Sequence, residues 1–432
     1  MTDSSPDIPP TWWSALSVYF ERKLLLVLAM GFSGGLPLAL VYATLSARLA
    51  EAGVSKTAIG LFVWASTAYT LKFLWSPLVD QMRLPGLTSW AGQRRGWLLA
   101  AQAGVIIGMI GLGVSDPTLS LGAVAAWAVF LAFASATQDI VIDAYRIESL
   151  SEEQQGAGAA AYVFGYRIAM AVSGGGALIV ADQFGWFAAY AVMAVCMAVG
   201  IAATLMAVEP KLMTDNDANI PKPKNMWAWF ERAVIAPFTD FIGRPHWIAV
   251  LLFIAFYKYG DALLGVMATP FYLEIGFSLT DIGWVTKGFG IVATIIGGIV
   301  GGVLVLRHGI LTALLIGGFA QAASNLVFVA QAAIGPSVPF LVVTVAVENA
   351  TGGMATTAFI AYLSSLCSLH YTATQYALLS SLMAFARTGF SSAGGWLADQ
   401  MDWVLYFGLT TVAALPGLVL LIYLIRRAPV PR

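Results

Sequence analysis

The chain has 432 residues, of which 59% are hydrophobic and only 10% are charged, with a net charge of −1 and a mean hydropathy of +0.80. Soluble domains carry about 25% charged residues, so this composition excludes a water-soluble globular protein. A net charge near zero argues against a nucleic-acid partner, which calls for clustered basic surface. The two cysteines and three histidines are scattered, so no disulfide framework, metal site or cofactor is expected.

Apolar stretches of about 20 residues, long enough to cross a bilayer as helices, define the predicted elements. They predict an all-α polytopic membrane protein with twelve transmembrane helices, in contact with the lipid bilayer. The first stretch is too long for a cleavable signal peptide. The expected spans are 24–49, 57–77, 97–115, 118–146, 157–181, 186–208, 247–272, 282–305, 311–333, 338–366, 375–398 and 403–425.

Basic residues predict the orientation of these helices. If the N-terminus is cytoplasmic, the outer loops carry only Arg48 and Lys56, and most other lysines and arginines lie in cytoplasmic segments. This is the positive-inside pattern. We therefore expect a multi-pass protein with both termini in the cytoplasm.

The first predicted helix contains Gly34, Gly35 and Pro37. These residues can break the regularity of the helix where its backbone faces a cavity. Gly34 and Gly35 are therefore candidate substrate-binding positions.

The fourth predicted helix ends in a charged stripe made by Asp139, Asp143 and Arg146. Their spacing of i, i+4 and i+7 places them on one helix face. A charge in hydrocarbon costs about 2.5–3.5 kcal/mol, so such residues usually serve a solute or a proton. Asp139, about 10 Å from the cytoplasmic end, is the candidate proton switch, and Arg146 is expected to hold Asp143 charged. Alternatively, both aspartates only clasp arginines and gate loops.

The fifth predicted helix places Arg167 about 16 Å from its cytoplasmic end, close to the midplane. There its guanidinium cannot reach the interface by snorkelling. We expect Arg167 to line a cavity, although a purely structural pairing with a carboxylate of the fourth helix is the alternative.

A polar, proline-containing segment divides the chain into residues 1–208, a linker at 209–245, and residues 246–432. Within the linker, residues 226–235 contain Trp227 and Trp229 and predict a short interfacial helix. The two outer parts are expected to be six-helix bundles.

The second half contains its own charged positions within spans. Lys258 and Asp261 are spaced i, i+3 and can neutralise one another, as a structural or a functional pair. Glu348 stands alone near the middle of a span and is a candidate proton site. Lys72, near the inner end of the second helix, is expected to snorkel.

The two halves also resemble each other in sequence. The segment 53–60 between the first two helices matches 276–283 between the seventh and eighth. Arg167, followed by Gly174-Gly175 and Ala181-Asp182-Gln183, matches Arg387, followed by Gly394-Gly395 and Ala398-Asp399-Gln400. Such repeats are typical of transporters built from two halves around a central site, and they make Arg387 the repeat mate of Arg167.

Twelve helices, a 6+6 repeat and a long central loop resemble the major facilitator superfamily. Asp80, followed by Gly92-Gln93-Arg94-Arg95-Gly96, resembles the gating loop of that superfamily, with several residues inserted after Asp80. The resemblance implies that Asp80, Arg94 and Arg95 bridge helices on the cytoplasmic side. Positive-inside anchoring is the competing explanation for the two arginines.

Longer segments resemble the AmpG permease family: residues 31–38, 69–80, 94–97, 136–146 and 165–167. This resemblance implies a secondary active transporter of the bacterial inner membrane. It would import GlcNAc-1,6-anhydroMurNAc-peptides by proton symport. Such import serves cell-wall recycling and feeds β-lactamase induction. The alternatives within the wider family are a carrier for acetyl-CoA, a siderophore or another amphipathic solute.

Other function classes leave different signatures. A primary pump needs a Gly-Lys nucleotide motif, and a metalloprotease needs an H-E-x-x-H run; the sequence contains neither. An enzyme is therefore not expected. A channel or a transporter-like receptor would share the helices and stays an alternative.

Overall fold

A computed structural model describes residues 16–55, 58–59, 62, 67–210, 225–227 and 231–427. The regular elements of these described ranges are helices. The first half contains α2 (Arg22–Val41), α3 (Ala43–Glu51), α5 (Thr67–Leu71), η3 (Lys72–Leu74), α6 (Ser76–Gln81), α7 (Leu87–Ala91), α8 (Gln93–Val114), α9 (Leu121–Ser149), α10 (Gln155–Ala171), η4 (Val172–Gly176), α11 (Ala177–Cys196) and α12 (Ala198–Met206). The second half contains η5 (Glu231–Ile235), α15 (Ala236–Ile242), α16 (Trp247–Phe256), α17 (Tyr259–Glu274), α18 (Leu279–Gly283), η6 (Trp284–Phe289), α19 (Gly290–His308), α20 (Ile310–Ile334), α21 (Val338–Ser365), α22 (Thr372–Ala398), α23 (Trp403–Ala413) and α24 (Leu415–Arg427).

Nine stretches of the described residues are long and apolar enough to cross a membrane. One of them, Gln155–Met206, is 52 residues long and covers the fifth and sixth predicted spans. Its helical backbone is interrupted at Gly185, whose φ of 83° and ψ of 165° a side chain would disfavour. Helix α22 matches the eleventh predicted span, and the second span is described only in part. The structure is therefore compatible with twelve transmembrane helices.

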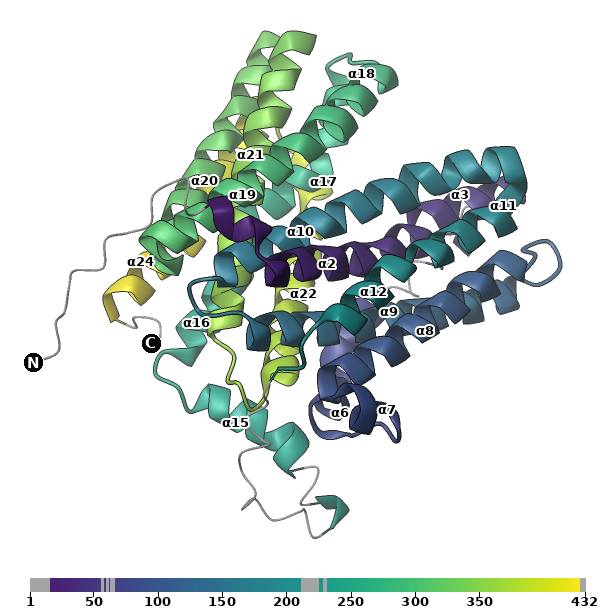
Figure 1. Cartoon of the computed structure of the whole chain (residues 1–432). Coiled ribbons are helices and arrows are strands. Elements are labelled where there is room, and N and C mark those ends of the chain that lie inside the picture. The colour runs from purple at the N-terminus through teal and green to yellow at the C-terminus, as the bar shows by residue number, and fades with distance from the viewer. Residues whose placement is uncertain are drawn as a thin grey trace, which may run out of the picture.

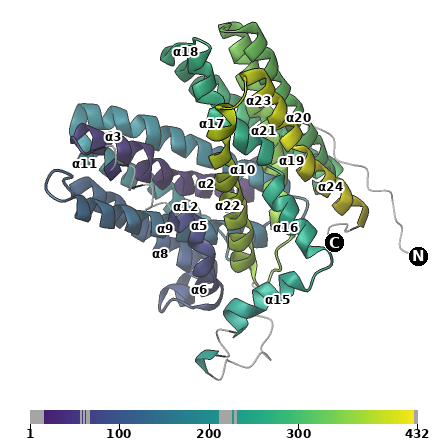
Figure 2. The ribbon, with the colours of Figure 1, turned by 180° about the vertical axis from the view of Figure 1, so that it is seen from behind.

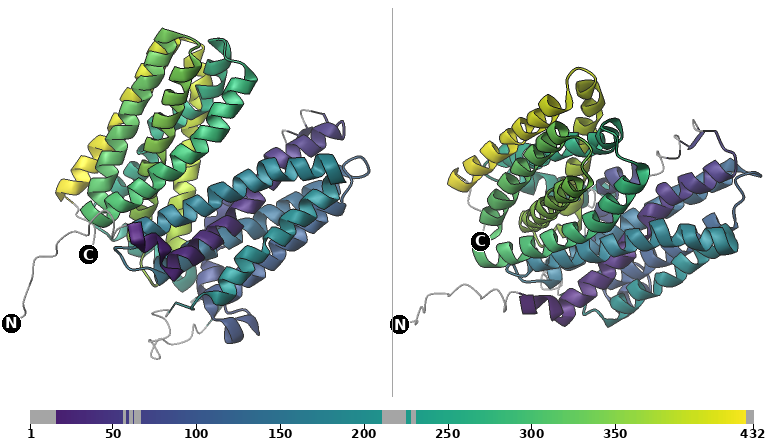
Figure 3. Two further views of the ribbon diagram at one scale, coloured as in Figure 1. Left: turned by 45° about the horizontal axis from the view of Figure 1, so that its top comes forward. Right: turned by 90° about the horizontal axis from the view of Figure 1, so that it is seen from above.

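The helices form two bundles that diverge like the arms of a V (Figure 1, Figure 3). Helices α2 to α12 make the amino-terminal bundle, and α16 to α24 make the carboxy-terminal bundle. Seen from behind, α22 runs along the junction between them (Figure 2). The bundles touch through α10 with α19 and α21, and through α22 with α6 and α9. We call this region the closed end, and the opposite end the open end.

Buried hydrophobic residues connect the two bundles at the closed end. Ala373 and Ala377 of α22 pack in one cluster with Met30, Val141 and Tyr145 of the amino-terminal bundle. Ile147 of α9, in turn, joins a cluster of the carboxy-terminal bundle. The closed end is therefore a packed apolar interface as well as a polar one.

Helix α2 is continuous through Gly34 and Gly35, so the break predicted there is wrong. The backbone leaves the helical region later, at Tyr42, with φ −104° and ψ −95°. Both glycines are buried. A Cβ on Gly35 would overlap the carbonyl oxygen of Tyr166, so Gly35 permits close packing of α2 on α10.

The helix predicted at residues 226–235 is described only in part. Residues 228–230, including Trp229, lie outside the described residues. Residues 226–227 and η5 (Glu231–Ile235) are helical, and α15 continues to Ile242.

Candidate functional site

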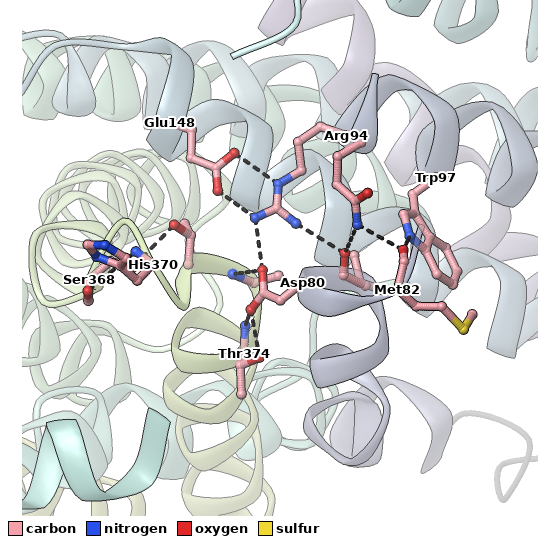
Figure 4. A network of polar contacts seen from close by, with 12 residues as sticks. Asp80, Met82, Arg94, Trp97, Glu148, Ser368, His370 and Thr374 are labelled. Atoms are coloured by element: carbon pink, nitrogen blue, oxygen red, sulfur yellow. Dashed lines mark hydrogen bonds and ion pairs between the residues drawn. The ribbon is translucent and has the colours of Figure 1, made fainter. Parts of the chain in front are cut away.

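Asp80 forms a polar connection between the bundles at the closed end (Figure 4). It lies near the end of α6, and its Oδ2 accepts hydrogen bonds from the backbone N–H (2.8 Å) and the hydroxyl (2.6 Å) of Thr374. Its Oδ1 accepts from the backbone N–H of Ala373 at 3.2 Å. These N–H groups open α22, so the carboxylate also meets the positive end of that helix dipole.

Arg94 holds Asp80 in this position. One guanidinium nitrogen of Arg94 lies 2.8 Å from Asp80 Oδ1 and 2.5 Å from Glu148 Oε1, and Nε donates to Glu148 Oε2 at 2.9 Å. All three side chains are almost fully buried. Arg94 therefore joins α6, α8 and α9 within one bundle, while Asp80 crosses to the other.

Arg95 bridges two helices, as the resemblance implies, but both helices belong to one bundle. Its guanidinium donates to the carbonyl oxygens of Thr204 and Leu205 at 2.9 and 3.0 Å. These are carbonyls of the last turn of α12, which lack helical partners. Arg95 thus ties α8 to α12 inside the amino-terminal bundle and does not reach α22.

Glu209, at the start of the linker, completes this region. Its carboxylate accepts the backbone N–H groups of Arg94 (2.6 Å) and Arg95 (3.0 Å) at the start of α8. Burial raises the pKa of Glu209, and the hydrogen bonds from Arg94 and Arg95 oppose that rise. The linker is therefore fastened to the same helix that carries the arginines.

Arg146 makes a second connection between the bundles. It is fully buried and lies on α9, with Nη2 3.5 Å from Asp143 Oδ1. Its Nη1 donates to Ser364 Oγ of α21 at 3.0 Å, and its guanidinium lies 5.5 Å from the ring centroid of Tyr376 of α22. The pairing of Asp143 with Arg146 agrees with the geometry expected from the sequence, but Arg146 also reaches across to the other bundle.

The sequence predicts that Lys72 snorkels to the surface, but in the structure it does not. It is buried on η3, with Nζ 3.7 Å from Asp143 Oδ2. Lys72 also interacts electrostatically with Asp139. Asp139 is buried, and its Oδ1 would lie 3.1 Å from a Cβ on Gly34. Gly34 therefore leaves room for the Asp139 carboxylate.

A second charged cluster lies at a break in the seventh span. Helix α16 ends at Phe256, α17 begins at Tyr259, and Lys258 has non-helical angles of φ −105° and ψ 17°. Lys258 Nζ lies 2.9 Å from Gln321 Oε1 and 3.6 Å from Asp261 Oδ2. Asp261 lies in the first turn of α17, where the helix dipole favours a carboxylate.

Glu348 is not alone, contrary to the sequence prediction. Its carboxylate accepts a hydrogen bond from Asn349 Nδ2 at 2.7 Å. It also interacts electrostatically with Asp261, Lys258, Arg167 and Arg387. Arg167 is the member of this group that comes from the amino-terminal bundle.

Arg167 and Arg387 face the region between the bundles. Both are exposed although each lies inside a long helix. The charged partners of Arg167 are Arg387, Glu348 and Asp261, all from the carboxy-terminal bundle. This geometry does not favour the alternative pairing of Arg167 with a carboxylate of α9.

The five residues Arg167, Lys258, Asp261, Glu348 and Arg387 form what we call the inter-bundle cluster. When all are ionised, three cations meet two carboxylates. The excess positive charge suits a solute with carboxylate groups, which a guanidinium can bind with two parallel hydrogen bonds.

Sequence reasoning missed several members of these sites. Glu148 and Thr374 were missed because their partners come from other helices, and Glu209 because it lies in the linker. Only Glu148 had a usable signal, as a further carboxylate two residues after Arg146 on the fourth predicted helix.

Known proteins resemble this chain in sequence and in fold. The Major Facilitator Superfamily model matches residues 24–272 and 250–432. The anhydromuropeptide permease of Escherichia coli K12 is 41% identical over 409 residues, which cover 94% of this chain and 80% of that protein. The proton:xylose symporter XylE has a TM-score of 0.69 at 13% identity, covering 96% of both chains. The transporter FucP in its outward conformation has a TM-score of 0.70 at 11% identity, covering 94% of this chain and 99% of that one.

Two helical bundles that meet at one end and hold charged side chains between them define a membrane transporter for a small solute. The chain belongs to the Major Facilitator Superfamily and, within it, to the AmpG-type muropeptide permease family. The predicted fold class is therefore confirmed, as is the prediction of a transporter rather than an enzyme.

Replacing Asp80 should open the closed end. Asp80→Asn removes the ion pair with Arg94 and weakens the three contacts with α22. Hydrogen bonds to charged groups contribute about 1.5–3 kcal/mol each, so we expect the closed-end contact to lose at least about tenfold in population. Leu119 and Pro336 are exposed in the open-end loops of the two bundles. The distance between spin labels at these two positions should become shorter, because the open end closes when the closed end opens.

Asp116→Asn is the matched control for this measurement. Asp116 also accepts a threonine N–H and hydroxyl, those of Thr118, at 2.8 and 2.7 Å, but within one exposed loop. These hydrogen bonds lower the pKa of Asp116. The control should keep the wild-type distances. An Asp80→Asn distribution identical to wild type would show that Asp80 does not hold the closed end.

Proposed function

We propose that this protein imports anhydromuropeptides across the bacterial inner membrane. The observation that carries the proposal is the inter-bundle cluster, in which Arg167 and Arg387 come from different bundles, both interact with Glu348, and leave an excess of positive charge. Muropeptides carry peptide carboxylates that such guanidinium groups bind. The 41% identity with an anhydromuropeptide permease supports the same solute. Import of this kind would serve cell-wall recycling and, through it, β-lactamase induction.

The proposed orientation places the closed end in the cytoplasm. Arg94, Arg95, Arg146 and the basic ends of α2 and α24 lie at or near that end, as the positive-inside rule requires. The described arrangement is then outward-facing, with the inter-bundle cluster accessible from the periplasm. Opening of the closed end would release the solute into the cell.

Coupling to protons is assigned to Asp139, with Glu348 as a second candidate. Asp139 is buried close to the cation Lys72, the carboxylate Asp143 and several tyrosines. Movement of the bundles changes the distance to these groups, so the carboxyl can take up and release a proton during the cycle. Asp143 is held between Lys72 and Arg146 and has less freedom to do so.

Uptake into vesicles distinguishes muropeptide from the other solutes of the wider family. Labelled GlcNAc-anhydroMurNAc-peptide should enter vesicles that contain the protein, saturably and only with an inward proton gradient. Acetyl-CoA and a ferric siderophore serve as competitors. Uptake of a competitor without the muropeptide would overturn the proposed substrate. Flux that does not saturate would indicate a channel, and signalling without flux would indicate a receptor.

Arg167 should determine affinity for the solute. Arg167→Lys keeps the charge but loses the two-pronged geometry, so we expect about a tenfold loss of kcat/KM for uptake and a larger loss for Arg167→Ala. Arg22→Lys is the control, because Arg22 is exposed and donates to the carbonyl oxygen of Met206 at 3.0 Å, away from the inter-bundle cluster. Normal uptake by Arg167→Ala at normal abundance would remove Arg167 from the binding site.

Asp139→Asn should separate transport from its driving force. The variant keeps the shape of the side chain but cannot exchange a proton, so we expect exchange of solute at equal concentrations to persist and proton-driven accumulation to stop. Both are measured in the same proteoliposomes. Loss of both activities would instead assign Asp139 to binding or gating, and intact accumulation would exclude it from the proton path.

A further inference from the structure

Three buried side-chain oxygens near Asp139 form no hydrogen bond with the described residues. They are Tyr69 Oη of α5 and, on α9, Ser135 Oγ and Asp139 Oδ1. Ser135 and Asp139 are spaced i, i+4 and share a helix face. Tyr69 interacts with both of these side chains, through its hydroxyl with Ser135 and through charge with Asp139. The three oxygens therefore belong to one buried polar region.

We propose that Tyr69, Ser135 and Asp139 bind one ordered water molecule and that this site delivers the proton to Asp139. The proposal rests on the proton coupling proposed above. An unsatisfied buried polar group costs about 1–3 kcal/mol, and native proteins usually satisfy such groups with buried water. A buried water needs two to four polar partners, which this site provides.

The positions of these side chains along the amino-terminal bundle give the proposed proton path a direction. Ser135 lies one helical turn farther from the closed end than Asp139. Tyr42, which also interacts with Tyr69, lies where α2 ends, some 20 residues from the closed end, and is half-buried. The series Tyr42, Tyr69, Ser135 and Asp139 therefore leads inward from the open half of the molecule.

The chemistry of the transfer is balanced without any further reactant. Hydroxyl groups both donate and accept hydrogen bonds. A proton that arrives on the Tyr69 side is accepted by the water, which passes another of its protons to Asp139 Oδ1. A new O–H bond forms on the carboxylate, the water is regenerated, and both hydroxyls keep their own protons.

The surroundings of Asp139 favour a proton over a metal cation. The charged or titratable groups that face it are Lys72 of η3, Asp143 of α9, Tyr69 of α5, and Tyr162 and Tyr166 of α10. From α2 it meets Gly34, which carries no side chain. Lys72 already supplies a cation, so a metal ion would be repelled there.

The test is time-resolved infrared spectroscopy of the full-length protein in liposomes after a drop in pH. The carboxylic-acid band present in wild type and missing in Asp139→Asn reports protonation of Asp139 and needs no solute. We expect Tyr69→Phe and Ser135→Ala, each of which removes one oxygen, to slow the appearance of this band about tenfold with unchanged final amplitude. Tyr190→Phe is the control, because buried Tyr190 donates to Leu40 O at 3.3 Å in the same bundle.

Wild-type rates in both Tyr69→Phe and Ser135→Ala would overturn the water relay and leave the proposed role of Asp139 intact. A wild-type protein with no Asp139-dependent band would overturn the coupling role itself, and the relay with it. A band that Na⁺ suppresses and K⁺ does not would show a cation site in place of the water.

Discussion

Each ionised side chain inside the bilayer needs a partner, because an isolated charge in hydrocarbon is strongly unfavourable. The amino-terminal bundle meets this requirement with two cations and two carboxylates. Lys72 and Arg146 both pair with Asp143, and Lys72 also interacts with Asp139. The carboxy-terminal bundle meets it with Lys258 and Asp261 at a break between α16 and α17. The two groups differ in charge balance. The group around Asp143 has equal numbers of cations and carboxylates, whereas the inter-bundle cluster, to which Lys258 and Asp261 belong, has one more cation than carboxylates. In the function proposed above, the evenly paired site serves protons and the site with excess positive charge serves an anionic solute.

Residues that match in the sequence repeat have similar roles in the two bundles but different neighbours. Gln155 donates to the carbonyls of Ile147 and Leu150 at the end of α9. Gln375, which lies 12 residues before Arg387 as Gln155 does before Arg167, accepts the N–H of Ser368 in the loop before α22. Both glutamines therefore brace the loop that leads into the helix carrying Arg167 or Arg387. The rest of each bundle then decides which charges the two arginines meet.

Helix positions and local pairs could be predicted from the sequence because both depend on short-range periodicity. The pair of Asp143 and Arg146 lies within one turn, and the spacing of Lys258 and Asp261 is equally local. Lys72 could not be placed, since its partner lies on α9, about 70 residues later. The prediction for Glu348 failed for the same reason: its neighbours are set by how helices pack. Gly34 and Gly35 were misjudged because glycine has two uses, and in α2 they allow close approach of a neighbour rather than a break.

The partner of Asp80 in the other bundle is a helix end. When the bundles separate, the amide groups of Ala373 and Thr374 pass to water, and the carboxylate keeps its ion pair with Arg94. Neither bundle is then left with an unpaired charge. An ion pair between an acid of one bundle and a base of the other would leave one unpaired charge on each. The contact also makes little demand on the identity of residue 373, because any amino acid except proline supplies the same N–H group. A contact between a carboxylate and a helix end is readily reversible. It tolerates substitution in the first turn of α22 but not at Asp80.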